Sequence, residues 1–157
     1  MAVKPIPDGY HAVTPYLFVE GVDRLLKFVK QAFDATEILR VPRPDGSTMH
    51  AEVRIGGSAV MMGDPTGPAA QFGPMPSSIY LYVTNCDAVY QRALEAGGTS
   101  VKEVQDIPFN GERYGGVKDP VGNIWWIATH IKDVSIEEST KQLKAAEGRD
   151  EKLRTPQ

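Results

Sequence analysis

An internal repeat constrains this chain more than any other feature of its sequence. The stretch from Thr14 to Phe33 combines an extended run with an apolar stripe at helical spacing. The same pattern returns 64 residues later, from Ser78 to Gly97, with Tyr16 matched by Tyr80. A strand followed by an amphipathic helix therefore occurs twice in register. Such repetition predicts two similar modules in one chain.

Each copy continues into short apolar segments separated by turns, so each module has the order β-α-β-β-β. The first module covers about 11–64, the second about 78–130, and a proline-rich linker of 65–77 joins them. Residues 131–157 form a C-terminal helix, starting at the capping box of Ser135 and Glu138 and ending near Ala146, and a charged tail. In detail, we expect strands at 11–19, 35–41, 47–55, 58–63, 79–84, 99–104, 113–118 and 124–130, and helices at about 22–33 and 85–96. This is an α+β fold in a single domain spanning 1–157.

Composition excludes several classes of function. The net charge of -3 gives no reason to expect nucleic acid or an anionic membrane as a partner. The N-terminus lacks an apolar signal region and no run approaches membrane-spanning length, so we expect a cytoplasmic protein. The single cysteine, Cys86, falls in the apolar stripe of the second helix and is expected in the core.

Several phrases of the sequence are more specific than the repeat. They are Val13-Thr14-Pro15-Tyr16-Leu17, Met49-His50-Ala51-Glu52, Arg113-Tyr114-Gly115, Asp119-Pro120-Val121-Gly122-Asn123 and Ile127-Ala128-Thr129-His130. With the tandem modules, they resemble the vicinal oxygen chelate superfamily of glyoxalases, extradiol dioxygenases and bleomycin-resistance proteins, and in particular its PhnB-like branch. The resemblance implies that the modules form a curved, partly closed eight-stranded sheet with the helices outside and a ligand cavity on the other face.

The same resemblance places the superfamily's metal ligands on residues that bind metals poorly. The first-strand positions fall on Thr14 and Ser78, and one last-strand position falls on Trp126. The remaining position falls on Met61 or Met62. Divalent metals prefer imidazole, carboxylate or thiolate ligands. We therefore expect no metal at the usual site and no cofactor.

One pair of residues has the character of an acid–base site. His50 and Glu52 are two apart on an expected strand, so they share a face, and a carboxylate beside an imidazole can fix its tautomer and raise its basicity. The pair could equally close a structural hydrogen bond. It could also begin a relocated metal site with His11 or His130, which sequence spacing cannot test.

Aromatic residues stand out on the same inferred face, away from the helices: Tyr16, Phe18, Tyr80, Tyr82 and Trp126. Each alone is an ordinary core residue, but together they could wall a cavity for a planar or cationic ligand. Arg54, on the face of His50 and Glu52, together with Arg113 and Tyr114, could reach a ligand's polar end, although strand-end positions would also explain the last two.

These observations predict a metal-free protein that binds an aromatic or apolar small molecule. The alternative is a lyase, isomerase or dioxygenase-like enzyme that uses His50 and Glu52 as a base or as a relocated metal site. A purely structural module is a third reading. We also expect a homodimer, because a half-open sheet leaves edges and an apolar concave surface exposed.

Overall fold

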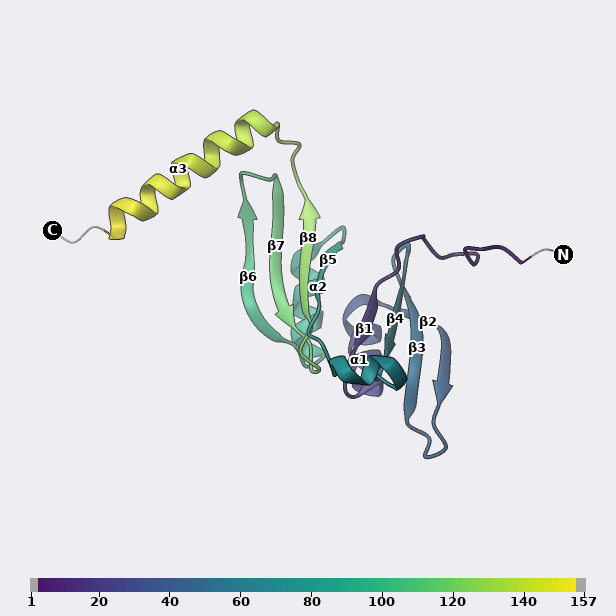
Figure 1. Cartoon of the computed structure of the whole chain (residues 1–157). Helices are drawn as coiled ribbons and strands as arrows, with labels where there is room; N and C mark the ends of the chain where they lie inside the picture. Colours follow the sequence, from purple (N-terminus) through teal and green to yellow (C-terminus); the bar gives the residue numbers. More distant parts are fainter. Residues whose placement is uncertain (1–2, 155–157) are drawn as a thin grey trace.

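The computed structural model describes residues 3–154, with side chains to residue 148, and contains two four-stranded sheets, three α-helices and one 3₁₀ helix (Figure 1). In chain order the elements are β1 (Tyr16–Phe18), α1 (Val22–Phe33), β2 (Thr36–Pro42), β3 (Thr48–Ile55), β4 (Ser58–Gly63), η1 (Gly67–Phe72), β5 (Ser78–Tyr82), α2 (Cys86–Glu95), β6 (Thr99–Ile107), β7 (Glu112–Lys118), β8 (Ile124–His130) and α3 (Ile136–Arg154). The α+β class and the order of elements in both modules are confirmed.

Each sheet has the first strand of its module at one edge. The strand orders are β1-β4-β3-β2 and β5-β8-β7-β6, and in each sheet the first strand runs parallel to the last while the remaining pairs are antiparallel. The repeat is visible in the register, because Tyr16 lies opposite Met61 as Tyr80 lies opposite Trp126. The eight strands thus form two separate sheets, rather than the single curved sheet implied by the family resemblance.

Several boundaries differ from those expected. β1 begins only at Tyr16, because Pro15 has no N–H for a ladder and Thr14 instead donates its hydroxyl to the carbonyl of His11. The proline-rich linker contains the short helix η1, which has Pro68 in its first turn. The helix α3 runs eight residues beyond Ala146, through Gly148. Its start is as expected, since the N–H of Glu138 donates to Oγ of Ser135 at 3.2 Å.

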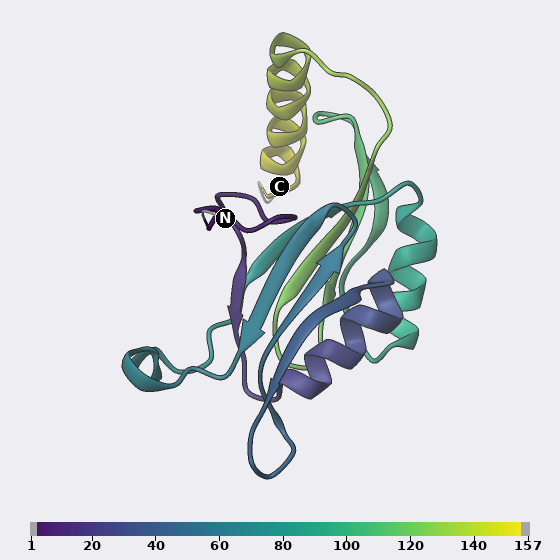
Figure 2. The ribbon, with the colours of Figure 1, turned by 90° about the vertical axis from the view of Figure 1, so that its right-hand side faces the viewer.

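Both modules share one hydrophobic core built around the two helices. The apolar side of α1 is fully buried, and its Phe33 ring lies 4.7 Å from the ring of Trp125 on β8. The helices α1 and α2 also pack on each other, and Figure 2 shows them together on one side of the strands. Cys86 is buried in this core, as expected. Its members come from both sheets, so one continuous core joins the two modules.

The shared core decides which way the other faces of the sheets point. Leu17, Val53 and Met62 face the core in the first module, and Trp125, Ile127 and Val117 face it in the second. Neighbouring residues on a strand point to opposite faces. The alternate residues therefore point away from the core on each sheet, and we call these surfaces the outer face of module 1 and the outer face of module 2. They are the faces on which the sequence placed the candidate residues.

The helix α3 stands apart from this arrangement. It projects from the second module away from both sheets (Figure 1), makes no extended contact with another element, and has no buried residue between Ile136 and Gly148. No helix in the described part of the chain is long and apolar enough to cross a membrane.

Candidate functional site

The outer face of module 1 carries a chain of hydrogen-bonded polar side chains. The hydroxyl of Tyr16 lies 2.9 Å from Nδ1 of His50, and Nε2 of His50 lies 2.9 Å from Oε1 of Glu52. The hydroxyl of Tyr10, from the segment before β1, donates to the other oxygen of Glu52. His50 and Glu52 are both on β3 with one residue between them, so the strand itself brings them together.

Burial and hydrogen bonding keep the two tyrosines of this hydrogen-bonded series protonated. Glu52 is only 8% exposed. Burial and the negative charge of Glu52 raise the pKa of Tyr16, whereas the pKa of Tyr10 is raised first by its hydrogen bond to Glu52. Both phenols therefore stay protonated at neutral pH and act as donors. With Nε2–H donated to Glu52, Nδ1 of His50 is free to accept from Tyr16.

Arg54 lies on the same face but is engaged by the chain's own N-terminal segment. Its guanidinium donates to the carbonyl of Gly9 at 2.9 Å. The contact fixes the segment that carries Tyr10 over the sheet. We expected Arg54 to reach a ligand's polar end, and in this structure its guanidinium binds the N-terminal segment.

The outer face of module 2 is a cluster of aromatic rings. The rings of Tyr80 and Tyr82 are 5.2 Å apart, Tyr80 and Tyr114 are 5.9 Å apart, and Tyr114 meets Trp126 edge to face at 6.0 Å. The ammonium of Lys102 lies 5.6 Å from the centre of the Tyr114 ring. The indole N–H of Trp126 donates to Oγ of Ser78 at 2.9 Å. Four of the predicted aromatic residues therefore come together here.

A buried carboxylate that the sequence reading missed anchors this cluster. Glu112 is 7% exposed and accepts hydrogen bonds from the hydroxyls of Tyr80 and Tyr82, the second at 2.6 Å, and from the Asn110 amide at 3.3 Å. Burial, then the bond to Glu112, raises the pKa of Tyr80. We expected this strand to begin at residue 113. A start one residue earlier would have placed Glu112 on the same face as Tyr114 by strand alternation.

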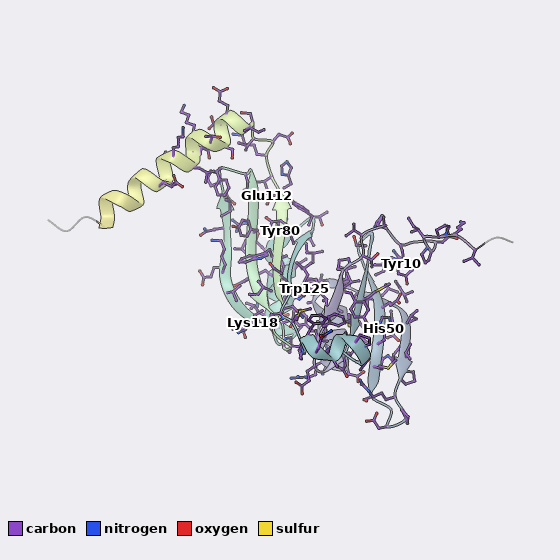
Figure 3. The ribbon with its side chains drawn as sticks, in the orientation of Figure 1. Tyr10, His50, Tyr80, Glu112, Lys118 and Trp125 are labelled. Atoms are coloured by element: carbon purple, nitrogen blue, oxygen red, sulfur yellow. The ribbon has the colours of Figure 1, made fainter. Side chains whose placement is uncertain are left out.

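The two outer faces are separate within one chain. Tyr16 contacts Phe18 and His50 on module 1, whereas Tyr80, Tyr82, Tyr114 and Trp126 contact one another on module 2. Figure 3 shows the buried Trp125 between them, with Tyr10 and His50 on one side and Tyr80 and Glu112 on the other. Within one chain the expected aromatic residues therefore form two groups, one on each sheet, because the sheets share a core through their helix-bearing faces.

Arg113 does not lie with Tyr114 on the outer face. It points to the helix side, where its guanidinium binds Asp87 of α2 at 2.7 Å and Asp106 of β6 at 2.9 Å. These hydrogen bonds raise the pKa of Arg113 and lower that of Asp87. Arg113 ties α2 to its sheet, in agreement with the structural reading of this residue.

The positions that correspond to metal ligands carry no suitable donors. The register pairs Met61 with Tyr16, which selects Met61 over Met62 as the counterpart of Trp126. The hydroxyl of Ser78 is already bonded to Trp126. Among the described side chains, no three His, Cys, Asp or Glu residues lie close enough together to hold a metal ion. Neither His11 nor His130 therefore forms a metal-binding group with His50 and Glu52, and His130 instead pairs with Asp133 at 3.0 Å.

Comparison with known proteins agrees with this arrangement. Residues 10–127 match the family model of the Glyoxalase/Bleomycin resistance protein/Dioxygenase superfamily. The chain belongs to this superfamily. The match covers both modules and confirms the resemblance to vicinal oxygen chelate proteins.

Relatives in this superfamily show the fold more than the function. The uncharacterized protein Mb0911c of Mycobacterium bovis is 38% identical over 135 residues, which cover 81% of this chain and 88% of that protein. The crystal structure of TioX from Micromonospora sp. ML1 has 26% identity and a TM-score of 0.67, covering 77% of this chain and 99% of that one. A glyoxalase-related enzyme from Fulvimarina pelagi, at 18% identity and a TM-score of 0.61 over 76% and 87% of the two chains, shares the fold alone.

Proposed function

We propose that the protein binds an aromatic or apolar small molecule, without a metal at the superfamily's usual positions, in a cavity completed by a second copy of the chain. The observation that carries the proposal is the pair of outer faces, each with aromatic side chains around a buried carboxylate. Tyr16 and Tyr80 are 42% and 43% exposed and Tyr82 is 61% exposed. Aromatic rings left this open on two faces are suited to stacking against a ligand and a partner.

Pairing of two chains brings the separate faces together. When module 1 of one copy faces module 2 of the other, Tyr16 and His50 stand opposite Tyr80 and Trp126 from the partner copy. The twofold arrangement creates two such cavities with identical walls. A planar ligand would then lie between the rings, and the two buried carboxylates favour one that carries a positive charge. We also propose that the chain belongs to the PhnB-like branch of the superfamily, which the PhnB-like phrases of the sequence support.

Binding and pairing are tested together with the neutral planar dye Nile red. Light scattering should give about twice the chain mass of 17.2 kDa. Trp126→Ala should weaken dye binding at least tenfold, since it removes the largest ring of the module 2 face. Phe72→Ala is the matched control, because Phe72 is 62% exposed on η1, outside both faces. A monomer at micromolar concentration, or equal dye binding by wild type and Trp126→Ala, would contradict the proposal.

A second candidate is acid–base catalysis, which the bond between Tyr16 and His50 favours. Tyr16 is the exposed end of the chain, His50 can relay a proton, and buried Glu52 holds the imidazole in one tautomer. Native mass spectrometry of the purified protein should identify a bound ligand. Proton exchange of that ligand in D2O would then support catalysis if it is fast with wild type and lost in His50→Ala and Tyr16→Phe. Exchange at the uncatalysed rate would leave binding as the function.

A further inference from the structure

A groove at the junction of the two modules shares only Tyr82 with the outer-face clusters. Its volume is about 870 Å³, and its walls come from the end of α1, the β3–β4 turn, the ends of β5 and β8, and α2. Phe33, Ile55 and Val89 contribute apolar surface, and each is largely buried, between 5% and 9% exposed. A mostly apolar groove of this size suits a small organic molecule.

One cationic side chain in this groove has an unused donor. The guanidinium of Arg92 reaches Asp34 with one nitrogen at 2.8 Å, while its Nε–H is enclosed and has no acceptor among the described residues. An enclosed N–H without a partner is unfavourable, so an acceptor supplied from outside would be stabilised there. Among the groups lining the groove, no enclosed acceptor is similarly left without a donor in the described chain. Within the described chain, the groove therefore has an unpaired hydrogen-bond donor and needs an acceptor from a ligand.

A ligand can displace Asp34, the existing partner of Arg92. Asp34 is 74% exposed at its side chain and Arg92 is 41% exposed, and an ion pair so open to water is worth little. The planar guanidinium can bind both oxygens of a carboxylate at once, which a single contact with Asp34 does not do. The other titratable groups in the groove have partners outside it, since His130 pairs with Asp133 and the hydroxyl of Tyr82 donates to Glu112.

We propose that this groove binds a small carboxylic acid with an apolar body. Its carboxylate displaces Asp34 and accepts from the fork of Arg92, including Nε–H. Its hydrocarbon part lies against Phe33, Ile55 and Val89, between the two modules. Apart from Tyr82 at its edge, the site uses no residue of the outer-face clusters, and it would link ligand binding to the packing of module 1 against module 2.

Octanoate is a suitable probe, followed by amide NMR shifts of the full-length protein. The largest shifts should occur at Gly56, Val83 and Thr84, which line the groove. Neutral 1-octanol should bind at least tenfold more weakly than octanoate. Shifts centred on Tyr80, Tyr114 and Trp126 would place the acid on the outer face instead and overturn the proposal.

Three variants make the test specific. Arg92→Met keeps an apolar stem but removes the fork, so octanoate should bind at least tenfold more weakly. Lys27→Met is the control, because it removes an equal charge from an exposed position on α1 that does not line the groove. Asp34→Asn should bind two- to fivefold more tightly, since it removes the competing carboxylate, and asparagine tolerates the positive φ of 53° at this position.

The Asp34→Asn measurement keeps the proposal testable if Arg92→Met folds poorly. Unchanged or weaker octanoate binding by Asp34→Asn overturns it, as does binding by folded Arg92→Met within twofold of wild type. Loss of Nile red binding in the Trp126 variant does not affect this result, so failure of the two proposals can be told apart.

Discussion

The hydroxyl of Tyr16 lies 2.9 Å from Nδ1 of His50 although a whole strand, β4, runs between the strands that carry them. The contact crosses β4 at Gly63, which lies between Phe18 and His50 in the sheet. A Cβ added to Gly63 would lie 2.5 Å from the Tyr16 hydroxyl. The absence of a side chain at residue 63 therefore allows the tyrosine to reach the histidine.

Gly63→Ala should break the contact between Tyr16 and His50 without unfolding the protein. The added methyl displaces the phenol, and the resulting overpacking should cost about 1–3 kcal/mol of stability. The ¹⁵N shift of His50 Nδ1 should move to the value of an imidazole without this bond, and Tyr16, now more exposed, should titrate at lower pH. Gly57→Ala is the control, because its added Cβ meets nothing within 4 Å. Identical Nδ1 shifts in Gly63→Ala and Gly57→Ala would contradict this role of Gly63.

Glu112→Gln should lower the pKa values of Tyr80 and Tyr82. Burial is the largest cause of the raised pKa of Tyr80 and is unchanged by the variant, so its pKa should fall only part of the way. The pKa of Tyr82 should lose a larger share of its own rise, since the bond to Glu112 is the first cause of that rise. Tyrosinate absorbance measures both pKa values. Glu103→Gln is the control: it changes an exposed carboxyl on β6 that forms no side-chain hydrogen bond or ion pair with the described residues, so it should leave the titration unchanged.

Glu112→Gln should also change how the folding stability depends on pH. A tyrosine whose pKa is raised on folding contributes stability that is full below about pH 10, the pKa of an unfolded tyrosine, and is lost as the pH rises through the folded value. Wild type should therefore lose stability above about pH 10, and Glu112→Gln should lose less over that range. At neutral pH the variant should be less stable by about 1–3 kcal/mol, because two partly buried hydrogen bonds lose their charged acceptor. A steeper alkaline loss in Glu112→Gln than in wild type would refute this.

The sequence predicted features that depend on local patterning and missed those that depend on contacts between distant segments. The repeat and strand alternation correctly placed Tyr16, His50, Glu52 and Trp126 on the faces away from the helices, because period-two patterning is local. The relative direction of the two faces depends on which surfaces of the modules pack together, through contacts such as Phe33 with Trp125. No local pattern encodes that choice. Tyr10 was missed for a related reason, since an irregular segment has no period that would place its hydroxyl on Glu52.

Removal of α3 should leave the fold intact. The helix makes no extended contact with the body, and an isolated helix of this length is only marginally stable in water. A chain ending at residue 135 should melt within about 2 °C of the full chain. The shorter deletion of 148–157, which the charged tail also suggests, should have no larger effect; residues 155–157 lie outside the described residues. A loss of more than about 2 kcal/mol in either deletion would show instead that the removed segment docks on the body of the protein.

Metal content is the remaining prediction that separates binding from metal chemistry. Thr14, Met61, Ser78 and Trp126 offer two hydroxyls and a thioether, which compete poorly with water for a divalent ion. Protein purified without added metal should carry well under one equivalent of zinc, nickel, iron or manganese, and a chelator should not change its melting temperature. Trp126→Glu restores a carboxylate at one position but removes a wall of the module 2 face, so it should weaken Nile red binding without creating a metal site. The matched measurement is elemental analysis of His50→Ala. A stoichiometric metal in wild type that disappears in His50→Ala would contradict the proposal of a metal-free binding protein. His50 and Glu52 would then be the first two ligands of that metal. The bond from Tyr16 would have to break to free Nδ1 of His50.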